Sequence, residues 1–161
     1  MAKGPGGLTV STKPKLNNKL INCVLEHIEH EVALGTEKYN QNNWGVIDWD
    51  KVDKAVKEGE DTEVNQTMCG TSACFAGWAC MLSTPLKEWR KIMGRGIEWH
   101  NEGQKRLGLT GDESALLFGG TDAHGGKRQL EIIKLRLKVI RESRERGVPL
   151  YQHSDYEDCE G

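Results

Sequence analysis

Apolar residues recur every three or four positions along two long stretches of the chain. Residues three or four apart lie on one face of a helix, so this spacing predicts two amphipathic helices. Gly35 is placed to end the first, because glycine readily adopts the left-handed conformation that closes helices. In residues 16–34 the apolar positions are Leu16, Leu20, Ile21, Val24, Leu25, Ile28 and Val32, and in residues 127–146 they are Leu130, Ile132, Ile133, Leu135, Leu137, Val139 and Ile140.

Shorter helices are predicted between these two. One follows Asp48, which is a suitable cap, and another over residues 72–82 stops before Pro85, whose ring disfavours helical geometry in the preceding residue. Further helical turns are expected over residues 86–93 and 97–107, and a last short helix begins at Thr110 or Asp112. The pattern therefore predicts an all-α fold, a compact single-domain bundle of about five to six helices.

The two ends of the chain differ from this middle. Residues 1–15 are rich in glycine and proline with few apolar groups, which is typical of a flexible N-terminal arm. The helical domain is expected over residues 16–147, and residues 148–161 are predicted to form a mobile, acidic C-terminal tail. A length of 161 residues suits one domain that buries its own core.

The charge balance narrows the possible partners. With 22 basic and 24 acidic residues the formal net charge is −2, so the chain lacks the basic excess that drives non-specific nucleic-acid binding. The start has no apolar leader, and no run is long enough to span a bilayer, so we expect a cytoplasmic protein without membrane contact. In a reducing cytoplasm five cysteines indicate free thiols or metal ligands.

Three of those cysteines fall within residues 69–80. Thr71 is a good N-cap, and a Cys74 in the first turn would meet the positive end of the helix, which favours a thiolate. The small residues that follow would let another element approach closely. The residues singled out as a structural motif are Cys69, Gly70, Thr71, Cys74, Gly77 and Trp78.

These cysteines admit three interpretations. Cys69 and Cys74 could share a zinc ion with a histidine, whereas Cys74 and Cys80, six apart on a helix, point in different directions. A nucleophilic cysteine would need a base, for which His100, His124 and His153 are available without a recognisable partner motif. We expect buried, structural thiols, with no metal, no cofactor and no catalytic residue.

A second candidate metal site lies on the first predicted helix, where His27, His30 and Glu31 fall within one turn. The order of these residues matches no metalloprotease helix, and no third ligand is evident. We therefore expect a solvated polar face there.

The segment Cys69-Gly70-Thr71 to Ala79 resembles the pattern Cys-Gly-Thr-x-x-Cys-x-Ala-Gly-Trp-Ala of a group of small uncharacterised proteins found in bacteriophages and bacterial genomes. The resemblance extends over roughly residues 40–120, through Leu107-Gly108-Leu109 and Leu117-Phe118. It implies a phage-type accessory protein and implies no reaction.

A glycine-rich loop precedes the last predicted helix. Its backbone N–H groups, the helix N-terminus and two cations would all favour an anion such as a nucleotide phosphate. Its spacing matches no phosphate-binding fingerprint, so a flexible connector is the competing interpretation. The ligand-binding candidates are Gly119, Gly120, His124, Gly125, Gly126, Lys127 and Arg128.

The candidates for a protein interface come from two places. Trp89 and Trp99 are each flanked by charged residues, and tryptophan is favoured at interfaces. The last helix presents more apolar surface than one facing helix can cover, which favours a homodimer through Ile132, Leu135 and Val139.

The sequence as a whole predicts a non-enzymatic, phage-type accessory protein that binds a host protein and interferes with it or with host defence. The alternatives are a sponge for a nucleotide or another anionic small ligand, and a thiol- or zinc-dependent enzyme.

Overall fold

The computed structural model describes residues 13–35, 39–41, 49–58, 74–93 and 98–160. Over these residues the chain is all-α, which confirms the predicted fold class. The elements are α1 (Asn18–Leu34), α2 (Trp49–Lys57), α4 (Phe75–Leu82), η1 (Leu86–Glu88), α5 (Trp89–Met93), α6 (Glu98–Leu107), α7 (Gly111–Phe118), α8 (Gly126–Arg146), η2 (Leu150–Gln152) and η3 (Tyr156–Glu160).

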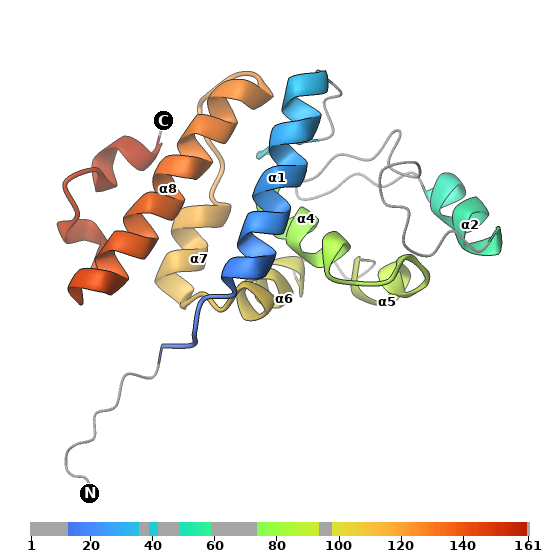
Figure 1. The fold of residues 1–161 in the computed structure, drawn as a ribbon, viewed down its shortest axis with the longest axis horizontal. Helices are drawn as coiled ribbons and strands as arrows, with labels where there is room; N and C mark the ends of the chain where they lie inside the picture. Colours follow the sequence, from blue (N-terminus) through green and yellow to red (C-terminus); the bar gives the residue numbers. More distant parts are fainter. Residues whose placement is uncertain (1–12, 36–38, 42–48, 59–73, 94–97, 161) are drawn as a thin grey trace, which may run out of the picture.

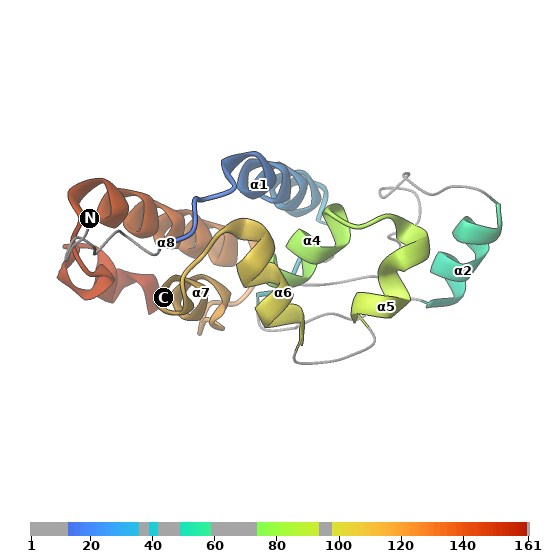
Figure 2. The same cartoon turned by 90° about the horizontal axis from the view of Figure 1, so that it is seen from below.

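The helices form two layers. The two longest, α1 and α8, lie side by side over α4, α6 and α7 (Figures 1 and 2). The short helix α2 lies at one end of the molecule, and the C-terminal segment with η2 and η3 lies at the other (Figure 1). No helix in the part of the chain that the structure describes is long and apolar enough to cross a membrane.

Helix α1 ends where its sequence predicts, and it begins two residues after Leu16, the first position of the predicted stripe. The Asn17 side chain accepts a hydrogen bond from the Leu20 N–H at 3.0 Å, and Gly35 closes the helix with a φ of 68°. The Asn17 N–H donates to the Leu107 carbonyl at 2.9 Å, so the start of α1 is fixed to the end of α6. The buried face includes Ile21, Val24 and Ile28, which belong to the predicted stripe.

Helix α4 is the centre of the core. It begins at Phe75 with Cys74 at the N-cap, so Cys74 precedes the first turn, contrary to the sequence prediction. Residues 75–81 are all buried, and the small side chains admit α6, since a Cβ on Gly103 would lie 3.3 Å from the Ala76 Cβ. Cys69, Gly70 and Thr71 lie outside the described residues, as does Asp48.

The side chain of Gln41 provides polar contacts that the helix ends require. It is buried; its Nε2 donates to the carbonyls of Leu117 at 2.9 Å and Gly119 at 3.0 Å, where α7 ends. Its Oε1 accepts from the Tyr39 hydroxyl at 3.0 Å and from the Phe75 N–H at 3.3 Å. One side chain therefore satisfies the start of α4 and the end of α7, which lack partners of their own.

The N-terminal residues that the structure describes pack on the domain. Gly108, which joins α6 to α7, has a φ of 73°, and a Cβ there would lie 2.0 Å from the Lys15 carbonyl oxygen. The Pro14 carbonyl accepts a hydrogen bond from Arg144 at 2.6 Å. The flexible arm predicted over residues 1–15 is therefore held at residues 13–15, and residues 1–12 lie outside the described part.

The C-terminal segment, residues 148–160, packs along α8, so the predicted mobile tail is wrong for these residues (Figure 1). Cys159 is fully buried, and its carbonyl accepts from the Arg136 Nε at 2.7 Å. Two further contacts join the segment to α8, Lys138 to Asp155 at 2.9 Å and His153 to Glu142 at 2.8 Å. Polar contacts hold a segment whose sequence has few apolar residues.

This packing also explains why the apolar stripe on α8 is wide. Ile132 and Val139 are buried within the chain, 2% and 0% exposed, yet they lie outside the main core cluster. They share a helix face with Arg136 and Ser143, the face that meets the C-terminal segment. The prediction that they form a free interface is therefore wrong, and Leu135 is half-buried.

Candidate functional site

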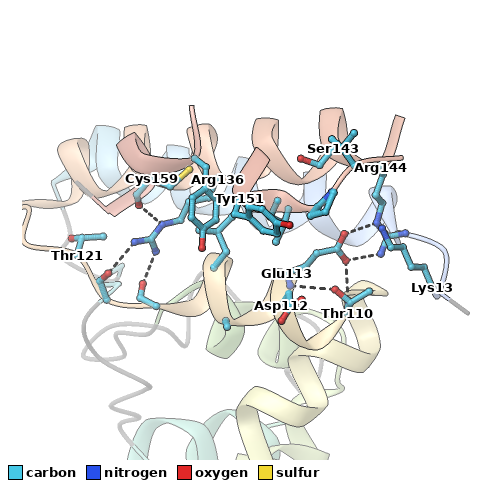
Figure 3. A pocket seen from close by; sticks show the side chains of 18 of the residues that line it. Lys13, Thr110, Asp112, Glu113, Thr121, Arg136, Ser143, Arg144, Tyr151 and Cys159 are labelled. Carbon is cyan, nitrogen blue, oxygen red and sulfur yellow. Dashed lines mark hydrogen bonds and ion pairs between the residues drawn. The ribbon is translucent and has the colours of Figure 1, made fainter. Parts of the chain in front are cut away.

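A cleft of about 860 Å³ opens between α7, α8 and the C-terminal segment (Figure 3). One wall is α7, a second is the face of α8 near its C-terminus, and η2 and η3 supply the third. The residues that line the cleft include Lys13, Thr110, Asp112, Glu113, Gly119, Gly120, Asp122, Arg136, Ser143, Arg144, Tyr151 and Cys159.

An arginine and a glutamate fix one end of the cleft. Arg144 donates from Nε and Nη2 to the two carboxylate oxygens of Glu113, at 2.7 and 2.6 Å. Glu113 also accepts from the Thr110 N–H at 2.8 Å, completing the capping box that starts α7. Burial alone would raise the pKa of Glu113, but the bonds from Arg144 and Thr110 outweigh it and hold the pKa below its usual value.

A second arginine fixes the other end. Arg136 is buried, and it donates from Nη1 to the Gly119 carbonyl, from Nη2 to the Gly120 carbonyl at 2.9 Å and from Nε to the Cys159 carbonyl at 2.7 Å. It thus joins the loop after α7 to the C-terminal segment (Figure 3). Arg136 and Arg144 are eight residues apart on α8, about 12 Å along its axis. Arg136, Arg144 and the groups they bond form a fixed frame around the cleft.

Other side chains that line the cleft are not part of this frame. The side chains of Asp112 and Asp122 are exposed and make no hydrogen bond or ion pair within the described part of the chain. Tyr151 is 69% exposed, so most of its side chain faces solvent. Ser143 is 2% exposed, and its Oγ has no hydrogen-bond partner among the residues that the structure describes.

The structure does not bring the seven glycine-loop candidates together. Gly119 and Gly120 line the cleft, and their carbonyls accept from Arg136. Gly125, Gly126 and Lys127 line a separate cavity of about 260 Å³, which the buried Glu31 also lines. His124 is exposed, and Arg128 is paired with Glu131 at 3.1 Å. A buried carboxylate beside the start of α8 is unfavourable for an anion.

The cysteine thiols that the structure describes are mostly buried. Burial raises the pKa of Cys74, and it raises the pKa of Cys80 to about 12 and that of Cys159 to about 11. The thiolate considered for Cys74 is therefore disfavoured, because the N-cap position gives less stabilisation than desolvation removes. Within the described ranges, no group of three histidine, cysteine or carboxylate side chains is placed to hold a metal ion.

The histidines have structural surroundings. His27 packs against Trp78 with ring centroids 4.2 Å apart and ring planes tilted by 52°, and Glu31 is buried, so these two residues do not lie on the solvated face that the sequence predicted. His30 is exposed, as predicted. His100 contacts Phe118 edge-on, and burial lowers its pKa. His153, in the C-terminal segment, lies 2.8 Å from the carboxylate of Glu142 on α8.

Among the tryptophan candidates, Trp89 is fully buried and its indole N–H donates to the Thr84 carbonyl at 3.1 Å. The prediction that Trp89 is an exposed contact is therefore wrong. The side chain of Trp99 lies outside the described part. The sequence gives no binding signal for Tyr151, Asp112 or Ser143. Tyr151 lies in a short polar segment, Asp112 at a helix start and Ser143 within a helix, and none of these matches a binding motif.

Comparison of the chain with protein-family models, with curated proteins and with solved structures found no match.

Proposed function

We propose that this protein acts by binding a segment of another polypeptide in the cleft between α7, α8 and the C-terminal segment. The observation that carries the proposal is a fixed frame with unused groups inside it. Arg136 and Arg144 hold the walls, while Tyr151, Asp112 and Asp122 face solvent.

The physical features suit binding. A volume of about 860 Å³ falls within the range of ligand-binding cavities. Exposed tyrosine is enriched at protein interfaces, because its ring gives contact area at a low entropic cost. A frame already held by hydrogen bonds loses little further freedom on association, which lowers the cost of binding.

The biological role we propose is that of a phage-type accessory protein, with a host protein or a component of host defence as the partner. This part rests on the resemblance of residues 69–79. The alternatives receive less support. The cleft presents carboxylates rather than free N–H groups to an anionic ligand, and the buried thiols have raised pKa values, which disfavours a thiol enzyme.

Affinity purification from bacterial lysate tests the proposal with matched variants. Tyr151→Ala removes the exposed ring from the cleft, and Val56→Ala removes an exposed side chain from α2 at the other end of the molecule (Figure 1). We expect a protein that the parent and Val56→Ala retain and Tyr151→Ala loses, since an aromatic anchor contributes about 2 kcal/mol or more. Equal retention by all three would contradict a role for the cleft.

A further inference from the structure

His153 lies between η2 and η3, where the C-terminal segment meets α8. Its side chain is 2% exposed, and both ring nitrogens have a partner. Nε2 lies 2.8 Å from a carboxylate oxygen of Glu142 on α8, and Nδ1 accepts a hydrogen bond from the Asp155 N–H at 3.0 Å. The imidazole therefore joins the segment to α8 and also fixes the turn within the segment.

These two contacts specify the protonation state of the imidazole. A backbone N–H can only donate, so Nδ1 is the acceptor and carries no proton. Nε2 then carries the single proton of the neutral ring and donates it to Glu142. The closed segment is therefore built around an uncharged His153.

A second proton on the ring would break one of these contacts. It must enter at Nδ1, which then becomes a donor that faces the Asp155 N–H at 3.0 Å. Two donors that face each other lose their hydrogen bond and gain no acceptor, which is costly where water is excluded. The ion pair with Glu142 offsets little of this cost, because that carboxylate is 35% exposed and ion pairs near solvent contribute little.

The other titratable and charged groups around the imidazole and its partners are Lys138, Glu142 and Arg146 on α8, and Asp155 and Cys159 in the segment. The bond with His153 lowers the pKa of Glu142, and the bond between Lys138 and Asp155 lowers the pKa of Asp155 and raises that of Lys138. Burial raises the pKa of Cys159 to about 11. Among these described groups, the imidazole is the one whose charge changes between about pH 5 and 8.

The way in which the segment is held makes a local release feasible. Among residues 148–159, His153 and Cys159 are the two buried ones. The further contacts with α8 include the bond from Arg136 to the Cys159 carbonyl at 2.7 Å and the exposed pair of Lys138 and Asp155. A segment with little buried apolar surface can open while the rest of the domain stays folded.

We propose that His153 makes the C-terminal segment a pH-sensitive strap, closed on α8 at neutral pH and released in mildly acidic conditions when Nδ1 takes up a proton. Release uncovers the face of α8 that holds Ile132 and Val139, and it removes the wall of the cleft that η2 and η3 supply. The inference goes beyond the proposed function and does not depend on it, because the segment opens whether or not the cleft binds a partner.

Hydrogen exchange measured by mass spectrometry at pH 7.5 and pH 5.5 tests the inference, with each rate divided by that of an unstructured peptide at the same pH. We expect the amides of residues 154–159 to lose protection by about 10-fold or more at pH 5.5, since one coupled proton shifts an equilibrium by up to about 10-fold per pH unit. The amides of α8 should keep their protection. Equal protection of residues 154–159 at both pH values, or an equal loss in α8, would overturn the inference.

Two replacements of His153 separate the role of Nδ1 from that of Nε2. His153→Asn places an amide oxygen near the position of Nδ1, where it accepts from the Asp155 N–H at either pH, so protection should not change with pH. His153→Gln places its amide near the position of Nε2 instead, so protection should be low at both pH values. His124→Asn, at an exposed histidine before α8, is the control and should keep the pH dependence of the parent.

These variants also give results that would contradict the inference. If His153→Asn keeps the pH dependence of the parent, another group senses the pH. If His153→Asn lacks protection already at pH 7.5, or His153→Gln is protected at both pH values, the contact of Nε2 with Glu142 holds the segment and the bond to Nδ1 does not. Either result would overturn the proposed strap.

Discussion

Single residues define the ends of the cleft, and the ionisation of Glu113 contributes to the stability of one end. Its side chain is 4% exposed and it accepts two bonds from Arg144. Because its folded-state pKa is lowered, its contribution to stability is present above the ordinary glutamate value and is lost as pH falls through the folded pKa.

Glu113→Gln should therefore lower the free energy of unfolding by about 2–3 kcal/mol at pH 7, and by less at a pH below the lowered pKa of Glu113. Urea denaturation at the two pH values measures the difference. Glu131→Gln is the control, because its pair with Arg128 is more than half exposed and should contribute at most about 0.5 kcal/mol. An equal loss at both pH values would show that the ion pair does not provide this stability.

Gly108 and Gly35 form a matched pair of left-handed glycines, with φ values of 73° and 68°. A Cβ at Gly35 meets nothing within 4 Å, whereas one at Gly108 would lie 2.0 Å from the Lys15 carbonyl. Alanine at either position costs about 1–2 kcal/mol of backbone strain, and Gly108→Ala should cost several kcal/mol more or displace residues 13–15. Thermal melts that show equal losses would contradict the close crossing at Gly108.

Helix caps could be predicted from the sequence, whereas long-range polar contacts could not. Gly35 and Thr110 were predictable as helix boundaries, because capping depends on neighbours in the chain. Gln41 and Arg136 were not. Gln41 bonds carbonyls 76 and 78 residues away, and Arg136 bonds one 23 residues away, so only the folded chain reveals those partners.

Among the elements, α4 has the close packing that its small side chains predict. Ala76, Gly77 and Ala79 are buried, and α6 packs closely against this helix. Its start was predicted three residues too early, because the cap is Cys74 and the N–H of Phe75 bonds Gln41 instead of a local side chain.

Gly77→Leu should destabilise the protein by about 1–3 kcal/mol or more, since a large side chain overfills a packed helix interface. Ala33→Leu is the control, because Ala33 is exposed on α1 and leucine is a good helix former. A melting temperature for Gly77→Leu that equals the parent's would contradict the packing of α4.

At the scale of the whole molecule, the cleft is built from segments far apart in sequence, around residues 13–15, 110–122, 136–144 and 148–160. The helical pattern predicted the bundle but not this assembly. The C-terminal segment is held through Arg136, Lys138 and Glu142, polar residues that a periodicity argument assigns to solvent. The homodimer stays a prediction, and it requires a surface other than that of Ile132 and Val139.

Release of the C-terminal segment should promote self-association, because it exposes the apolar face of α8. Cys159→Asp places a charge at a fully buried position against α8, whereas Ser154→Asp adds the same charge at an exposed one. Light scattering should give Cys159→Asp a larger mass than the parent protein has, and Ser154→Asp the same mass as the parent. Identical masses for both variants would show that the C-terminal segment does not cover a self-associating surface of α8.

The most direct test of the cleft as a binding site is photo-crosslinking in bacterial cells. A photoreactive phenylalanine analogue replaces Tyr151 in the cleft or Val56 on α2, and mass spectrometry sequences the joined peptide. We predict one partner protein joined at position 151 through a single segment, and no such product from position 56. No product at position 151, or the same set of peptides from both positions, would contradict binding in the cleft.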